Sequence, residues 1–274
     1  MPKTHGRKLV TAAASMAAAL AATGAAAQGQ APPPMIREYC VKVAPGKGAE
    51  YAALLRDVMV PLNQSRADAG EFSWYAVVRS VVPAGTSAPC DYRLAYGYKG
   101  LPPEEASTEA IDAALKRAKM TLTGEQLAAR RGALTTLVAV EIWGEIDGIG
   151  VPPQKNAYVR FNRYRTKNGE FDEWVRLERA TWKPVMDAWL KAGGKGSWSL
   201  NVLGAPGGES TPYNGMTVDI FPDWNGLMQG VPADELWPKV HPGTTTTDTF
   251  NRFDRSRSIH SIEIGKIVEV VRGK

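Results

Sequence analysis

Two glutamates, Glu141 and Glu263, lie in apolar, β-branched runs, LVAVEIWGEI and IHSIEIGKIV. Because side chains alternate between the two faces of a strand, each glutamate points away from neighbours such as Val140 and Ile262. We expect the aliphatic side to pack under helices and both carboxylates to face the other side. A carboxylate buried there has a raised pKa and can exchange a proton in a reaction.

Other polar side chains lie at similar positions of neighbouring strand-like runs. Trp74 and Trp198 each begin a run in which an apolar face alternates with a polar face, and the runs YRLAYGY and MTVDIF carry further polar residues. We predict a semi-polar cavity lined by Tyr75, Arg79, Tyr96, Asn201, Asp219, Glu141 and Glu263. Its acids, together with His241, are the acid–base candidates, and its other members would contact a ligand.

The same acids have a structural alternative, in which they form ion pairs with arginines and hold two sheets together. Arg79, Arg93 and Arg160 are the candidate partners for Glu141, Glu263 or Asp219. The sequence leaves both interpretations open.

The two histidines that follow the N-terminal region give little support to a metal site. His241 precedes Pro242 near the end of a helical pattern, where it could reach a cavity or cap the helix, and His260 is expected to pack in the core. No H-x-H, H-E-x-x-H or C-x-x-C spacing occurs, so no metal site and no cofactor are predicted. A haem or a single metal held by one histidine and carboxylates is the less favoured alternative.

The positions of these residues follow an internal repeat. PAGTSAP at 83–89 and PGGESTP at 206–212 share the frame P-x-G-x-S-x-P at an offset of 123 residues. Trp74 and Trp198 match at an offset of 124, and Glu141 and Glu263 at 122. The near-constant offset indicates a tandem duplication of about 120 residues.

Each repeat has the same predicted order of elements. A β-rich run precedes a helical pattern, which in the first repeat contains Tyr51, Leu54, Leu55, Val58 and Leu62. Two strands joined by the P-x-G-x-S-x-P turn follow, and then a second helical region and a last strand. Thr123 and Asp248 are predicted to be N-caps within the two second helical regions.

The resulting order, β-α-β-β-α-β twice, is the ferredoxin-like arrangement and defines an α+β fold. Predicted boundaries are 1–27 for a signal peptide, 28–35 for a Pro-rich mature N-terminus, 36–147 for the first repeat, 148–156 for a linker and 157–272 for the second repeat.

A duplicated ferredoxin-like unit resembles the dimeric α+β barrel superfamily, which includes NIPSNAP-like, EthD-like and antibiotic-biosynthesis-monooxygenase-like proteins. The resemblance implies that two sheets face each other within one chain and enclose a cavity. It also implies that the barrel cavity binds a small apolar or aromatic molecule, and the enzymatic interpretation is a lyase, isomerase or cofactor-independent oxygenase reaction on that molecule. The alternative is a non-catalytic periplasmic carrier or stress-associated binding protein.

The N-terminus predicts export. MPKTHGRK is basic, an alanine-rich uncharged stretch follows, and small residues at Ala25 and Ala27 suit cleavage near Ala27. We therefore predict a periplasmic or secreted protein without a stable membrane anchor; an uncleaved anchor is the alternative. Cleavage lowers the formal net charge from +5 to +2, because 30 Lys and Arg then face 28 Asp and Glu. This balance gives no case for nucleic-acid binding.

Two cysteines, Cys40 and Cys90, remain after cleavage. Export exposes them to oxidising conditions, so we predict that they form a disulfide bond. Two separately buried thiols are the alternative.

Overall fold

The computed structural model describes residues 33–208 and 211–274, and Pro33–Lys274 form one compact unit. The predicted signal peptide and its cleavage site lie outside the described residues. Within the described part of the chain, no helix is long and apolar enough to cross a membrane.

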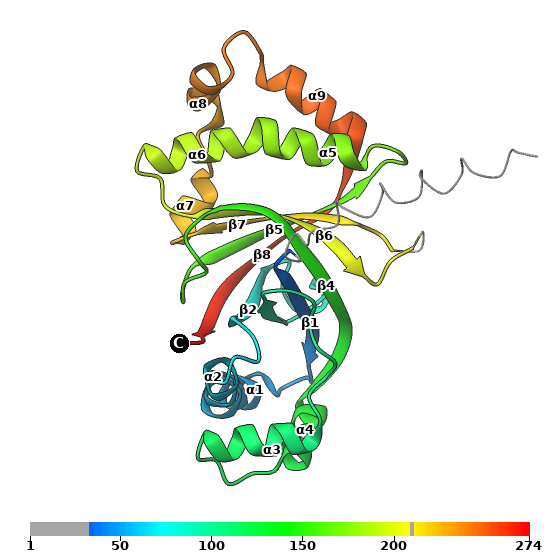
Figure 1. Ribbon diagram of the computed structural model, residues 1–274, viewed down its shortest axis with the longest axis vertical. Coiled ribbons are helices and arrows are strands. Elements are labelled where there is room, and N and C mark those ends of the chain that lie inside the picture. Colours follow the sequence, from blue (N-terminus) through cyan, green and yellow to red (C-terminus); the bar gives the residue numbers. More distant parts are fainter. Residues whose placement is uncertain (1–32, 209–210) are drawn as a thin grey trace, which may run out of the picture. The chain divides into compact units, whose positions relative to one another are not determined.

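The fold is α+β, and its order of elements is the predicted one (Figure 1). The strands are β1 (Met35–Val43), β2 (Trp74–Val82), β3 (Tyr92–Tyr98), β4 (Thr135–Gly150), β5 (Tyr158–Thr166), β6 (Ser197–Ala205), β7 (Gly215–Phe221) and β8 (Arg257–Arg272). The helices are α1 (Gly48–Leu54), α2 (Val60–Asp68), α3 (Thr108–Arg117), α4 (Gly124–Leu134), α5 (Phe171–Leu177), α6 (Lys183–Lys191), α7 (Trp224–Gln229), α8 (Ala233–Val240) and α9 (Thr246–Ser256). Two π-helical segments, Leu55–Met59 and Glu178–Trp182, join α1 to α2 and α5 to α6.

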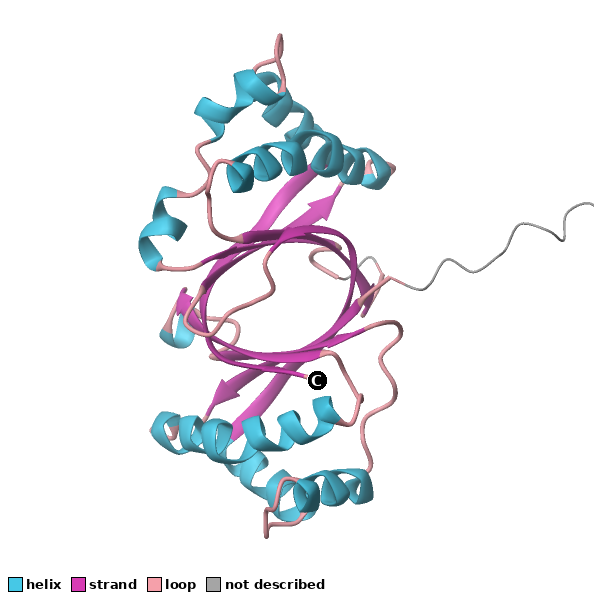
Figure 2. Cartoon of the chain, turned by 60° about the vertical axis from the view of Figure 1, so that its left-hand side comes forward, coloured by secondary structure: helices cyan, strands magenta, loops and turns pink. Residues whose placement is uncertain are grey.

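All neighbouring strands pair antiparallel and close into a barrel in the order β1-β3-β2-β8-β5-β7-β6-β4. The two long strands join the halves, because β4 pairs with both β1 and β6, and β8 pairs with both β5 and β2. Figure 2 shows the closed ring of strands with helices in two groups on opposite sides. Closure leaves each strand with one face toward the barrel interior and one toward helices or solvent.

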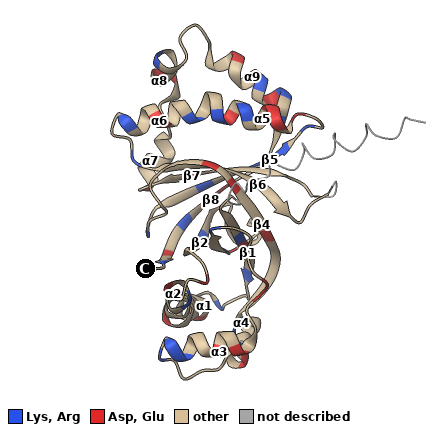
Figure 3. Cartoon of the chain, in the orientation of Figure 1, with Lys and Arg blue, Asp and Glu red and all other residues tan. Residues whose placement is uncertain are grey.

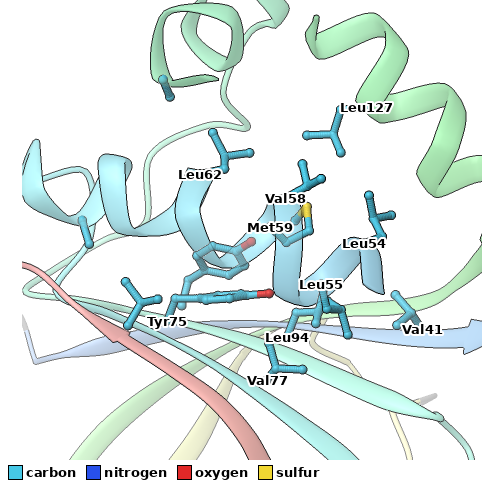
Figure 4. Packing of buried hydrophobic residues seen from close by; sticks show 14 of the residues in the cluster. Val41, Leu54, Leu55, Val58, Met59, Leu62, Tyr75, Val77, Leu94 and Leu127 are labelled. Carbon is cyan, nitrogen blue, oxygen red and sulfur yellow. The ribbon is translucent and has the colours of Figure 1, made fainter. Parts of the chain in front are cut away.

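Each group of helices covers the outer face of four strands. In the first half, Leu54, Leu55, Met59 and Leu62 pack on strand residues including Leu94 (Figure 4). In the second half, tryptophans and leucines of α5, α6 and β6 form the corresponding cluster. The helical pattern predicted from Tyr51 to Leu62 is therefore confirmed as the buried face of α1 and α2.

Local sequence signals fix several element ends. As predicted, the stretch 83–89 lies in the β2–β3 connection and the described part of 206–212 lies in the β6–β7 connection. Thr123 caps α4 in a capping box with Gln126. The prediction for Asp248 is wrong, because Thr245 caps α9 and its hydroxyl accepts from the Asp248 backbone N–H at 3.0 Å. Strand β4 also continues to Gly150, into the stretch predicted as linker.

The predicted burial of the aliphatic faces of β4 and β8 is wrong near their starts. Val138 and Ile262 are 51% and 50% exposed. Before Ile142, β4 pairs only with β1, and before Ile264, β8 pairs only with β5. These segments therefore have one unpaired edge, and their aliphatic side chains are exposed instead of packing under helices.

Cys40 and Cys90 form the predicted disulfide bond. Cys40 lies on β1, Cys90 lies two residues before the start of β3, and the two strands are neighbours in the barrel. The bond fixes the end of the first hairpin loop to β1.

Candidate functional site

The barrel encloses a cavity of about 470 Å³. Its walls come from the inward faces of nearly every strand and are mainly aliphatic and aromatic. They include Ile36, Ala76, Val78, Ala95, Trp143, Val159, Phe161, Met216, Val218 and Ile267. Such a volume and lining suit a small, mostly apolar molecule.

Trp74 forms part of this wall and depends on a glycine. A Cβ placed on Gly97 would lie 2.1 Å from the Trp74 indole. Gly97 is the cross-strand partner of Trp74 on β3. The absence of a side chain at Gly97 therefore lets the indole lie against the sheet beside the cavity.

One end of the barrel interior is filled by a buried ionic network. Arg163 donates to Glu38 and Glu263, both at 2.9 Å, and Arg93 donates to the same two carboxylates, both at 2.6 Å. Glu141 lies 3.7 Å from Arg163. We call these five residues the barrel network.

Aromatic residues complete the barrel network. The Glu141 carboxylate accepts from the Trp143 indole at 3.0 Å and from the Tyr213 hydroxyl. The Arg163 guanidinium lies 5.3 Å from the centre of the Tyr213 ring, close enough for a cation–π contact. Burial raises the pKa of Glu263, but Arg93 and Arg163 outweigh burial and the pKa is lowered. The network thus keeps Glu263 ionised and ties β1, β3, β4, β5 and β8 together.

The opposite end of the cavity is lined by the largely exposed segment 151–153 and by Glu145, Ser199 and Arg272. Glu145 is half-buried on β4, and its side chain has no hydrogen-bond or ion-pair partner among the described residues. Burial, and then repulsion from Asp147, raises the pKa of this carboxyl. Glu145 is therefore a carboxyl group free to contact a ligand at the cavity mouth.

The prediction placed Tyr75 and Tyr96 in the barrel cavity, and this placement is wrong. Both face the helices, and Figure 4 shows Tyr75 beneath Met59 and Leu62. Their rings contact each other at 4.8 Å between centroids. Both faces of the sheet are buried, so polarity along the strand did not reveal which face was inward.

Asp219 also lies on the helix-facing side of its sheet. It accepts from Arg160 at 3.1 Å and from Asn162 at 2.8 Å. The alternative interpretation, in which the acids form ion pairs with arginines, therefore describes Asp219 with Arg160 and Glu263 with Arg93. Arg79 is exposed on β2 and pairs with no acid in the described residues.

Asn201 lies on the predicted face of β6. The adjacent Leu200 lies on the opposite face, in the cluster that packs against the helices. Asn201 is fully buried and donates to Ser199, a residue of the cavity wall. Asn201 itself does not line the cavity, so the prediction that it is part of the cavity wall is wrong.

Neither histidine of the described residues lines the barrel cavity. His241 is the C-cap of α8, and its Nε2 lies 2.8 Å from the Thr181 carbonyl oxygen. His260, expected in the core, is exposed on β8 with its ring against Tyr213. The helix-cap interpretation of His241 thus describes its position, whereas the cavity interpretation does not. No group of three potential ligands among the described residues could hold a metal ion.

Sequence reasoning missed Glu38, Arg163 and Glu145. Glu145 follows Glu141 and Trp143 at alternate positions of β4, so strand alternation alone could have placed it on the same face. Glu38 and Arg163 lie on the first strand of each half, where no cross-strand partner could be identified without the barrel register.

Charges on the outer helices are of both signs. Along α5 and α9, basic and acidic residues are interspersed (Figure 3). Arg252 of α9 lies 3.0 Å from Glu173 of α5. Such exposed pairs contribute little, about 0–1 kcal/mol each, so the buried network is the more significant electrostatic feature.

No family model matches this chain, and no curated protein does. Solved structures do resemble it. A candidate monooxygenase from Lactobacillus acidophilus NCFM is 10% identical, with a TM-score of 0.50 over 88% of this chain and 96% of that one. A haem-binding protein from Thermus thermophilus is 10% identical, with a TM-score of 0.48 over 86% and 92%. The encapsulated DyP-type peroxidase from Mycobacterium smegmatis is 9% identical, with a TM-score of 0.47 over 90% and 95%. At 10% identity, the likeness to the first of these structures shows the fold alone, an α+β barrel.

Proposed function

We propose that this protein binds a small, neutral and mainly apolar molecule inside the barrel, with one polar group of the ligand at Glu145. One observation carries the proposal. An apolar cavity of about 470 Å³ contains at its mouth a half-buried carboxyl group without a partner among the described residues. Pockets of this size commonly hold a small ligand, with a few polar groups fixing its orientation.

The position of Glu145 defines the polar group that suits it. An ionised Glu145 accepts a hydrogen bond from a hydroxyl or amine, and a protonated Glu145 donates one to a carbonyl. The pKa of Glu145 is raised toward neutral pH, which increases the share of the protonated form at a given pH. Acid–base turnover of the ligand by Glu145 is the second candidate function, and a carrier without turnover is the simpler case.

Haem does not fit the barrel cavity. Haem iron is held by a histidine, cysteine, tyrosine or a methionine–histidine pair. Of these residue types, Met216 lines the cavity in the described chain, whereas Cys40 and Cys90 are bonded to each other and His241 and His260 lie elsewhere. The absence of a cofactor stays a prediction.

We further propose that the two halves are a tandem duplication and that the protein is exported. The repeated order of elements and the paired π-helical segments, 123 residues apart, support duplication. The Cys40–Cys90 bond supports export, because disulfides persist in oxidising compartments. Mass spectrometry of protein recovered from a periplasm tests export, which requires a mass that begins near Gln28. An intact N-terminus would contradict it.

Binding of the neutral aromatic probe N-phenyl-1-naphthylamine tests the barrel site. Trp74 and Trp143 line the cavity, so bound probe should quench tryptophan emission by energy transfer. Ala76→Leu adds bulk to the cavity wall and should weaken binding at least tenfold. Glu145→Gln should weaken it by about tenfold, the value of a hydrogen bond to a charged group.

Ala129→Leu is the matched control, because Ala129 is exposed on α4 and does not line this cavity. It should bind the probe as the parent protein does. If Ala76→Leu binds as tightly as Ala129→Leu while remaining folded, the barrel is not the binding site.

A further inference from the structure

A second cavity, also of about 470 Å³, lies on the other side of the first sheet, among α2, α3, α4 and the segment 99–107. Alternate residues of β3 separate the two spaces, since Ala95 faces the barrel cavity and Leu94 and Tyr96 face this one. We call it the helix-layer cavity. Its apolar wall consists of Met59, Leu62, Leu94, Ile111 and Leu127.

Three arginines line the helix-layer cavity, and two of them already have acceptors. Arg66 donates to Glu71 at 2.7 Å. Arg37 donates to the Pro103 carbonyl oxygen and lies 3.6 Å from Glu105. Arg131, half-buried on α4, has no side-chain hydrogen bond or ion pair among the described residues.

One tyrosine hydroxyl in the wall of the same cavity also has a proton to donate. Tyr96 accepts from Asn63 Nδ2 at 3.4 Å, which leaves its own proton without an acceptor among the described residues. The Asn63 carbonyl oxygen lies 3.5 Å from the Arg66 guanidinium. Arg131 and Tyr96 therefore both have donors in the cavity wall that no described residue accepts.

We propose that the helix-layer cavity binds a small molecule with one carboxylate and an apolar body, with the carboxylate at Arg131 and the Tyr96 hydroxyl. A carboxylate matches the planar donor fork of a guanidinium. A single charge is favoured over a dianion, because Arg131 is the cavity's one arginine left without a partner in the described chain, and Glu104 and Glu105 also line the cavity. The apolar wall would accept the rest of the molecule.

The second half does not repeat this arrangement. There Trp174 and Trp198 belong to the core cluster between helices and sheet. The Trp174 ring extends over β7 so closely that a Cβ on Gly215 would lie 2.3 Å from it. The site therefore belongs to the first half, and the proposal is independent of ligand binding in the barrel.

Binding of 4-phenylbutyrate and of its neutral analogue 4-phenylbutyramide, measured by calorimetry at pH 7 and low salt, tests the proposal. The acid should bind one-to-one and about tenfold more tightly than the amide, because it adds a charged hydrogen-bonded pair. Arg131→Gln should remove this preference, whereas Arg130→Gln, an exposed neighbour on α4, should retain it. Acid labelled with 13C at the carboxyl should show a lower carboxyl pKa when bound.

Three results would overturn the proposal. The first is equal affinity for acid and amide, or no binding of either. The second is an unchanged preference in folded Arg131→Gln protein, with Arg131→Lys used in its place if the glutamine variant does not fold. The third is loss of acid binding in Ala76→Leu but not in Arg131→Gln, because that result assigns the acid to the barrel cavity.

Discussion

Glu178 offers a direct test of the electrostatics in the second half. It lies in the π-helical segment between α5 and α6 and is 2% exposed. Its carboxylate accepts from the Trp174 indole at 3.2 Å and lies 3.6 Å from Arg257. Burial raises its pKa from 4.5 to about 7, and Arg257 only partly offsets this effect.

The shift has a defined effect on stability. The pKa is higher in the folded state than in the unfolded state, so the folded state binds the proton more tightly. The stabilisation is complete below pH 4.5 and is lost as the pH rises through about 7. At 1.36 kcal/mol per pKa unit the loss is about 3 kcal/mol.

Glu178→Gln removes the titrating group and keeps the shape. We expect the free energy of unfolding of the variant, minus that of the parent, to rise by about 3 kcal/mol between pH 4.5 and pH 8. The lost attraction between the Glu178 carboxylate and Arg257 is already part of this pH-dependent difference, because Arg257 is one of the causes of the shifted pKa. Urea unfolding followed by tryptophan fluorescence at each pH gives both values.

Glu173→Gln is the control, because Glu173 lies on α5 and hydrogen bonds to Arg176 and Arg252 lower its pKa. The free energy of unfolding of Glu173→Gln, minus that of the parent, should fall as the pH rises. A difference for Glu178→Gln that is flat from pH 4.5 to pH 8 would refute the reasoning, as would a transition centred near pH 4.5.

Three further perturbations test other parts of the structure. Arg163→Met leaves the three carboxylates of the barrel network with Arg93 alone and should destabilise the protein by about 3–5 kcal/mol, measured by urea unfolding; a loss below about 1 kcal/mol would show that the network is not energetically coupled. Gly97→Ala should displace the Trp74 indole, shift its emission and weaken binding of N-phenyl-1-naphthylamine, and an unchanged spectrum would contradict the tight contact. Replacing Cys40 and Cys90 by alanine opens a loop of 50 residues and should lower the free energy of unfolding by about 4 kcal/mol, measured by urea unfolding. An unchanged free energy of unfolding would show that the bond does not constrain the unfolded chain.

The sequence by itself determined the elements and their order. Apolar periodicity identified the helical face from Tyr51 to Leu62, turn residues located both hairpins, and Thr123 marked the start of α4. The near-constant offset between the halves indicated the repeated order of elements. The helical face, the turns and the helix start depend on residues close in sequence, and the repeat depends only on comparing the chain with itself. All of them can therefore be predicted without the tertiary structure.

Only the tertiary structure decided which face of each strand is inward and which charges meet. Tyr75 and Trp74 are adjacent on a strand buried on both sides, so contrast in polarity could not assign the barrel face. Arg163 meets Glu38 and Glu263 across 125 and 100 residues of sequence. Closure of the barrel fixes the register that brings these groups together, and it leaves Glu145 and Arg131 facing two separate cavities.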